Sequence, residues 1–248
     1  MTDLKINTLD PEEIARFSKI SSQWWNENEA FKPLHHLNPT RLDYIIKQLS
    51  QHYFKNTSKS LNFQGLSILD IGCGGGLVAE PLTRLGATVT GIDASEKTIE
   101  VAQAHAALMN LDIQYNCATA ESIATTGQQF DAVVALEIVE HVADVAGFVK
   151  SCHQLVKPGG LIIFSTINRT WKSYAVAIVG AEYVMRWLPV GTHEWQKFLT
   201  PSELGNTLKE AGLTVQGIAG MSFNPLSWTW SLSRDLDVNY FITGYRGS

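Results

Sequence analysis

Short apolar runs alternate with segments of helical spacing from about residue 66 to the end of the chain. The apolar runs are rich in valine and isoleucine and are bounded by glycine, proline or polar residues, which is typical of strands in α/β proteins. The predicted strands lie near residues 66–71, 88–92, 112–116, 131–136, 160–166, 214–221 and 238–244. The pattern predicts a seven-stranded, Rossmann-like α/β sheet whose last two strands form a hairpin-like edge.

The N-terminal part of the chain has a helical pattern. Residues 10–25 begin with a capping box and carry an apolar stripe that leads into Trp24 and Trp25, which we interpret as packing residues. Residues 31–37 are expected to form a loop, and a second helix is expected to start at Asn38. These helices precede the first predicted strand and are expected to cover one end of the sheet.

An unusually apolar segment follows the fifth predicted strand and reads WKSYAVAIVGAEYVMRWLP from Trp171 to Pro189. On a helix, Lys172, Glu182 and Arg186 fall within about 80° of one another, so the remaining circumference is apolar or small. Such a helix is buried, covers a ligand or touches lipid. No apolar run in the chain reaches the ~18 residues that a membrane-spanning helix needs.

Composition narrows the class of protein. A chain of 248 residues fits a single domain over 1–248, with an N-terminal helical lid over 1–60 and the apolar insert over 168–198. The formal net charge of −5, without basic runs, argues against a nucleic-acid partner. The three cysteines lack C-x-x-C spacing, and the N-terminus has no signal-peptide pattern, so a cytoplasmic protein without a zinc site is expected.

The first predicted strand runs directly into a glycine loop with Gly72, Gly74 and Gly76 at alternate positions. Glycine lets the backbone turn tightly and approach a ligand closely. The second strand ends in Asp93, where an acid can accept hydrogen bonds from a ribose diol. Together these features predict a nucleoside pocket at the carboxyl edge of a parallel sheet.

Asp70, just before the loop, bears on which nucleoside binds. The dinucleotide pattern G-x-G-x-x-G fails from Gly72, because Leu77 replaces the third glycine, but it passes from Gly74 in a form that ends at Ala79. An acid at Asp70 would repel a pyrophosphate and suits a ligand with a cationic amine. An NAD-dependent oxidoreductase nevertheless stays an alternative.

The fourth strand leads into Glu137, Glu140 and His141, which would point to one side if the chain turns helical there. Two carboxylates and an imidazole can bind a hard cation such as Mg²⁺, which would lower the pKa of an acceptor hydroxyl. Alternatively, His141 or a carboxylate takes the proton directly. A purely structural role, in which Glu140 and His141 cap a turn or line the pocket, stays open.

The pattern D-x-G-x-G-x-G from Asp70 resembles the first motif of class I S-adenosylmethionine (SAM) methyltransferases. Glu121 after the third strand, residues 130–134 and residues 157–160 agree with that resemblance. It implies SAM as the cofactor, with Asp70, Gly72, Gly74, Gly76, Asp93 and Glu121 among its binding residues.

Further segments resemble one family, the ubiquinone-biosynthesis O-methyltransferases. They are residues 24–25, 31–35, 38–42, 165–169, 179–183, 191–194 and 237–240. The resemblance implies methylation of catechol hydroxyls on polyprenylated rings, namely a polyprenyl-catechol and the late demethylubiquinol. Family contacts to SAM fall on Arg41, Gly72, Asp93 and Leu136, and the family's metal residues fall on Glu137, Glu140 and His141.

A prenylated substrate also gives the apolar insert a role, because an amphipathic helix beside the pocket can lie in the membrane interface while the ring enters. Peripheral attachment to the inner membrane and a complex with other ubiquinone-biosynthesis enzymes are therefore expected. The alternatives are a SAM methyltransferase for another small acceptor and a non-catalytic member of a biosynthetic complex.

Overall fold

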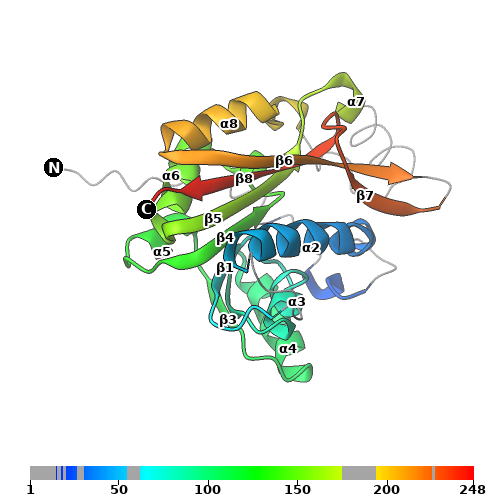
Figure 1. The fold of residues 1–248 in the computed structure, drawn as a ribbon. Coiled ribbons are helices and arrows are strands. Elements are labelled where there is room, and N and C mark those ends of the chain that lie inside the picture. The colour runs from blue at the N-terminus through cyan, green and yellow to red at the C-terminus, as the bar shows by residue number, and fades with distance from the viewer. Residues whose placement is uncertain are drawn as a thin grey trace.

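The computed structural model describes residues 15, 18, 21–26, 31–54, 62–174, 194–224 and 227–248. Within these ranges, eight strands form one mixed sheet in the order β3-β2-β1-β4-β5-β8-β6-β7 (Figure 1). The parallel half contains β1 (Ser67–Ile71), β2 (Thr88–Asp93), β3 (Gln114–Cys117), β4 (Phe130–Leu136) and β5 (Val156–Ile167). The antiparallel half contains β6 (Leu213–Asn224), β7 (Thr229–Ser233) and β8 (Asn239–Arg246).

Helices cover both faces of the sheet (Figure 1). One face is packed by α2 (Lys32–Tyr53), α3 (Ala79–Arg84) and α4 (Glu96–Leu108). The other is packed by α5 (Ala120–Ala124), α6 (Val145–Leu155) and α8 (Pro201–Glu210). Shorter helical segments are η1 (Ser21–Gln23), η2 (Val139–His141), α7 (Trp171–Ser173) and η4 (Trp195–Lys197).

Alternation along each strand divides the core into these two layers. Successive side chains of a strand point to opposite faces. Ile162 and Ile163 of β5 are both fully buried, yet they belong to the two different apolar clusters, and so do Val133 and Val134 of β4. Because helices cover both faces, the central strands are continuously apolar, which is why they were visible as apolar runs in the sequence.

Each of the seven predicted strands overlaps a strand of the structure, but the expected count was wrong because β7 was missed. β7 is a five-residue edge strand that pairs, among the described strands, with β6 alone, and none of its residues is buried. The preceding turn places Trp228 at φ +58°, a conformation that a bulky residue rarely adopts, so no glycine marks that position. The last predicted strand, β8, lies between β5 and β6 rather than at the edge.

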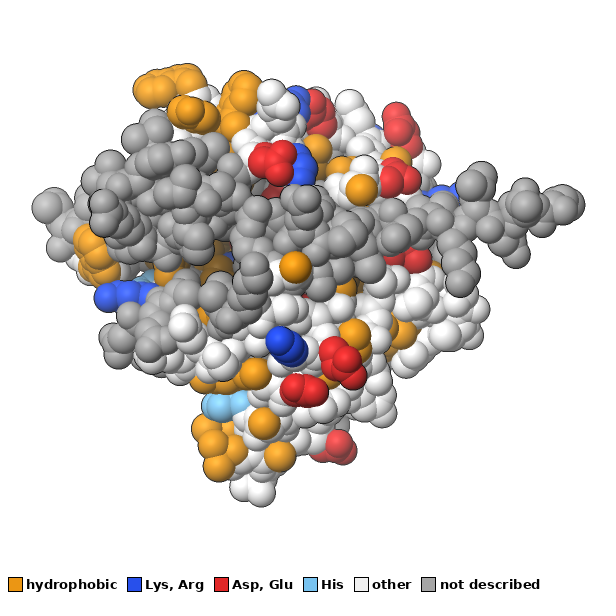
Figure 2. Space-filling model, turned by 180° about the vertical axis from the view of Figure 1, so that it is seen from behind, with side chains coloured by type: hydrophobic (Ala, Val, Ile, Leu, Met, Phe, Trp, Pro, Cys, Tyr) orange, Lys and Arg blue, Asp and Glu red, His pale blue; other side chains and the backbone are white. Residues whose placement is uncertain are grey.

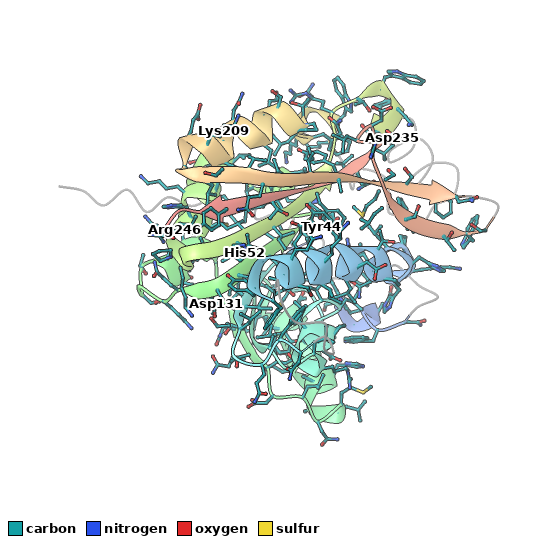
Figure 3. The ribbon with its side chains drawn as sticks, in the orientation of Figure 1. Tyr44, His52, Asp131, Lys209, Asp235 and Arg246 are labelled. Carbon is teal, nitrogen blue, oxygen red and sulfur yellow. The ribbon has the colours of Figure 1, made fainter. Side chains whose placement is uncertain are left out.

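Helix α2 begins at Lys32, so the predicted loop over 31–37 and the predicted start at Asn38 were wrong. Pro33 falls in the first turn, where its missing N–H costs nothing, and Pro39 lies inside the helix. Tyr44 of α2 points toward the antiparallel strands (Figure 3), where its hydroxyl lies 2.8 Å from Thr243 Oγ1 and its ring stacks on Phe241 at 4.3 Å. These contacts fix α2 against the middle of the sheet.

Most of the predicted helix over 10–25 and the centre of the apolar insert, residues 175–193, lie outside the described residues. The ends of the insert are described and carry exposed aromatic side chains: Trp171 is 81% exposed, Tyr174 48% and Trp195 38%. The rings of Tyr174 and Trp195 meet edge to face at 6.5 Å. Figure 2 shows hydrophobic side chains gathered at the end of the molecule where α7 lies in Figure 1.

Among the helices in the described ranges, none is long and apolar enough to cross a bilayer.

Candidate functional site

The direction of chain progression through the sheet reverses between β1 and β4. From β1 the chain continues outward to β2 and β3, whereas β4 and β5 lie on the opposite side of β1. Ligands of open α/β sheets bind outside the carboxyl ends of the strands at such a reversal. The strands that meet there end in the glycine loop, in Asp93 and, after β4, in Glu137. The structure therefore brings together the ends of β1, β2 and β4, from which most of the predicted site residues come.

The glycine loop between β1 and α3 adopts backbone conformations that favour glycine. Gly72, Gly74 and Gly76 have φ of 68°, 54° and 99°. Gly72 N donates to Ile92 O at 2.8 Å, which ties the loop to β2. A Cβ at Gly76 would lie 2.2 Å from the hydroxyl of Tyr115, so the loop lies directly against β3. The predicted strand, glycine loop and helix are confirmed.

Asp93 lies at the end of β2 with its carboxylate turned toward the loop. Its Oδ2 accepts a hydrogen bond from Gly74 N at 3.2 Å, and its Oδ1 accepts one from Ser95 N at 2.9 Å. Burial raises the pKa of Asp93, and the two amide hydrogen bonds oppose that rise. The carboxylate is only partly shielded from solvent, so it remains available to a ligand. Its contact with ribose stays a prediction.

Asp70 is a deeply buried acid of the site, with 3% exposure. Its Oδ2 has no hydrogen-bond partner in the described part of the chain. Burial raises its pKa from 3.8 to about 7, Arg41 opposes the rise, and Asp93 adds to it. A buried carboxyl with an unused oxygen beside a ligand pocket suits a cationic group, as its position before the loop predicted.

Arg41 and Glu137 form an ion pair that joins α2 to the end of β4. The Arg41 side chain is 5% exposed and the Glu137 side chain 18%. Glu137 has φ +48°, a conformation that costs free energy in residues other than glycine and occurs often at functional sites. Its Oε1 accepts a hydrogen bond from Ser165 Oγ at 2.6 Å, so both carboxylate oxygens have partners.

Glu140 and His141 follow Glu137 on a backbone path that differs from the predicted helix. They lie in η2, a 3-10 turn of three residues, and Glu137 precedes it with left-handed backbone. Glu140 is 3% exposed, and neither of its oxygens makes a well-formed hydrogen bond within the described residues, although Thr166 lies beside it. Burial raises its pKa, and His141 partly opposes the rise.

A metal site of Glu137, Glu140 and His141 is therefore not supported by the described residues and stays a prediction. No three His, Cys, Asp or Glu side chains in the described ranges are arranged to hold an ion. The physical reason is that the chain does not continue as a helix after β4, so the i, i+3, i+4 spacing does not place the three side chains on one face.

Two further predicted cofactor residues lie at the carboxyl ends of strands or just beyond them. Leu136 is the last residue of β4 and is 9% exposed, and Glu121 lies in the first turn of α5 after β3. Their contacts with a cofactor stay predictions. Sequence reasoning did not single out Ser165 as a site residue. Its position at the end of the fifth predicted strand, in register with Leu136, was the available signal.

Comparisons with known proteins agree with this geometry. The model of a methyltransferase domain family matches residues 35–217. The chain is 52% identical over 241 residues to a ubiquinone biosynthesis O-methyltransferase of Cereibacter sphaeroides, covering 97% of this chain and 98% of the relative. It is 54% identical over 234 residues to the protein of the same name from Roseobacter denitrificans, covering 94% of each.

A solved structure shares the fold at much lower identity. Magnesium protoporphyrin IX methyltransferase from Synechocystis PCC 6803 with bound SAM superposes with a TM-score of 0.63 at 16% identity, covering 97% of this chain and 99% of that one. At this identity the likeness concerns the fold alone.

Proposed function

Because the chain belongs to the family of ubiquinone biosynthesis O-methyltransferases, we propose that it methylates a catechol or quinol hydroxyl on a polyprenylated ring. The chain is a SAM-dependent methyltransferase. The choice of acceptor rests on one observation. More than half of the aligned residues are identical to those of ubiquinone biosynthesis O-methyltransferases, over nearly the whole length of both chains. The proposed substrates are a polyprenyl-catechol and the late demethylubiquinol.

Methyl transfer to a phenol needs an oxygen nucleophile in line with the methyl group. A phenol has a pKa of about 10, so little oxyanion exists at neutral pH and a proton must be removed. The acceptor oxygen then forms a bond to the methyl carbon while the bond to sulfur breaks, and the products are the methyl ether and S-adenosylhomocysteine. The proposed proton acceptor lies beyond the end of β4, two strands from the proposed ribose contact at the end of β2.

Glu137 is the proposed proton acceptor, with His141 as the alternative. Glu137 is the acid at the end of β4, it is partly exposed, and it is held in a strained backbone conformation. Its ion pair with Arg41 supports a link between cofactor and acceptor. When Arg41 turns to the carboxylate of SAM, Glu137 loses its cation and becomes a stronger base. Proton removal would then follow cofactor binding.

Mg²⁺ is assigned no step in this mechanism, because both carboxylate oxygens of Glu137 already have partners within the protein. The deciding experiment measures transfer of a labelled methyl group from SAM to a short-chain prenyl-catechol, with and without chelator. Methylated catechol is the expected product. Transfer only to an unrelated small acceptor would favour the alternative substrate class, and binding of NAD instead of SAM in calorimetry would overturn the function.

Attachment to a membrane surface is proposed for the apolar insert. The exposed aromatic side chains of Trp171, Tyr174 and Trp195 at its two ends support this, since aromatic rings favour the membrane interface. The protein would lie on the cytoplasmic side of the inner membrane, where it can meet its lipid substrate and other enzymes of ubiquinone biosynthesis.

Vesicle binding tests this attachment. The double variant Val176→Asp, Val179→Asp should bind lipid vesicles less than the wild-type protein while keeping most of its activity on a soluble short-chain catechol. Full vesicle binding by the folded variant would argue against a membrane role for the insert.

A further inference from the structure

A segment of the N-terminal region runs along the carboxyl edge of the sheet, across the ends of β2, β1 and β4. We name its described part, Ser18 with residues 21–26 and 31–41, the strap. Ser18 Oγ lies 2.6 Å from Ser95 Oγ just beyond β2, and Arg41 pairs with Glu137 beyond β4. Between these two points the strap meets the glycine loop.

The indole of Trp24 packs directly on the glycine loop. A Cβ at Gly74 would lie 1.9 Å from Trp24 Cζ2, and one at Gly75 would lie 2.1 Å from Trp24 Cδ1. Trp24 is 8% exposed and stacks against Phe31 at 3.9 Å, farther along the strap. The absence of side chains at two loop positions therefore makes room for a residue of the strap.

Trp25 attaches the strap to the same loop by a hydrogen bond and a stack. Its Nε1 donates to Gly75 O at 3.1 Å. Its ring lies on the imidazole of His105 in α4, with ring centroids 3.5 Å apart and planes 10° apart. One tryptophan thus contacts both the loop and the helix that follows β2.

A buried acid holds His105 in position for this stack. His105 Nδ1 lies 2.6 Å from Glu80 Oε1, and the Glu80 side chain is 4% exposed. Arg84 Nη2 also lies near this carboxylate, 3.6 Å from Glu80 Oε2. Glu80 belongs to α3, the helix that begins directly after the glycine loop, so the chain of contacts starts and ends at that loop.

We propose that Glu80, His105 and Trp25 are positioning residues that dock the strap over the glycine loop and thereby set how fast the cofactor and its product leave. The proposal rests on cofactor binding at that loop. Release of S-adenosylhomocysteine requires the strap to lift, which breaks the Trp25 hydrogen bond and its stack on His105. None of the three residues touches the reacting atoms, so each acts on residence time and not on the chemical step.

The test measures the dissociation rates of SAM and S-adenosylhomocysteine by stopped-flow displacement. Trp25→Ala and His105→Ala should each accelerate both rates about tenfold, the effect of losing one stack or hydrogen bond. Single-turnover methyl transfer at saturating SAM should stay unchanged. Trp25→Phe, which keeps a ring over His105, should restore most of the slow release.

His52→Ala is the matched control. Like Trp25, His52 contacts an aromatic ring and hydrogen-bonds to a backbone carbonyl, and its Nε2 lies 2.9 Å from Gly159 O. It lies at the end of α2 that is far from the strap. The His52→Ala variant should leave both dissociation rates unchanged. His105→Ala removes the nearer partner of the buried Glu80, so this variant can fail to fold. Trp25→Ala keeps the contact between Glu80 and His105. Wild-type dissociation rates in folded Trp25→Ala would overturn the proposal. If Asp93→Ala still weakens SAM binding in that case, cofactor binding at the loop survives without it.

Discussion

The two sides of the site hold their acids in different ways. On the cofactor side, Asp93 is held by the backbone amides of Gly74 and Ser95, within the segment that contains the glycine loop and the next strand. On the acceptor side, Glu137 is held by the side chains of Arg41 and Ser165, which come from α2 and β5. Backbone amides are present in every sequence, whereas a side-chain partner has to be of the right type and in the right place.

This difference separates binding from chemistry. An acid held by a fixed backbone presents the same geometry whether or not its surroundings move, which suits recognition of an invariant cofactor. An acid held by an arginine changes its basicity when that arginine finds another partner, which suits a group that must act at one step. The predictions below test the acceptor side and the cofactor side in turn.

The largest effect on turnover is expected for the Glu137→Gln substitution. Loss of a general base lowers turnover by about 10²–10⁴-fold. SAM affinity should stay equal or increase, because Arg41 no longer has a carboxylate partner in the cofactor-free protein and is available to SAM. Turnover on the prenyl-catechol and the dissociation constant of SAM are measured in parallel. A variant that loses SAM affinity and turnover together would show that Glu137 serves the cofactor side, and the contrast between the two sides would be broken.

The next effect concerns how the burial of Asp70 makes the stability of the fold depend on pH. Its pKa rises from 3.8 to about 7 on folding, so between these values the folded protein holds a proton that the unfolded chain has released. Folded-state stability is therefore lost as pH rises through this window. Asp70→Asn, which is neutral throughout, should exceed wild type in its free energy of unfolding by about 4 kcal/mol at pH 8 and nearly match it near pH 4.

Denaturant unfolding of the cofactor-free proteins across pH 4–8 measures this difference. If the free energies of unfolding of wild type and Asp70→Asn change with pH in parallel, the burial of the Asp70 carboxyl is compensated as fully as that of Asp93. The free energy cost of burying a carboxylate would then not be concentrated at Asp70, the acid that is placed to meet a cationic amine.

A smaller effect is expected for Asp93→Ala. The variant removes a charged acceptor for the ribose hydroxyls and should weaken SAM binding by about 1–3 kcal/mol. Folding should survive, because the carboxylate lies at a strand end and is only partly shielded from solvent. Calorimetric titration with SAM checks this, and an unchanged dissociation constant would remove Asp93 from the ribose site.

The same contrast explains what could be read from the sequence. The strands of the parallel half, the glycine loop and Asp93 follow from local spacing, and the structure confirms the elements that carry them. The Arg41–Glu137 pair joins residues separated by 96 positions, and Ser165 lies 28 positions from Glu137. No local pattern reports such contacts, because they depend on how α2 and β5 pack against the end of β4.

The metal prediction for Glu137, Glu140 and His141 rested on such a local pattern alone, and the described residues do not support it. Its spacing of i, i+3 and i+4 is a local signal, and it presupposes a helix from Glu137 onward. The chain instead leaves β4 through a left-handed residue and a short 3-10 turn. On that path Glu137 makes its ion pair with Arg41 and its hydrogen bond with Ser165, both of which are tertiary contacts.

The smallest predicted effect isolates the position of Glu137 from its charge. Ser165→Ala removes the hydroxyl that donates to Glu137 Oε1 at 2.6 Å and the contact between Ser165 Oγ and Glu137 N at 3.2 Å. Ser165 is fully buried, and Glu137 N still donates to Ser165 O at 3.0 Å, so the strand end keeps its backbone bond. The loss of about 1 kcal/mol from one hydrogen bond should lower kcat roughly fivefold.

Because the Ser165 hydroxyl also stabilises the anionic carboxylate, its removal should shift the acidic limb of the pH dependence of kcat, along which the general base loses its proton, toward higher pH. SAM affinity and thermal stability should change little. Thr243→Ser is the matched control, since it keeps the hydroxyl that meets Tyr44 on the same sheet and should leave the pH dependence of kcat unchanged. If Ser165→Ala lowers kcat with no change in its pH dependence, the role of Ser165 is limited to holding the strand end. Glu137 then takes its orientation from Arg41.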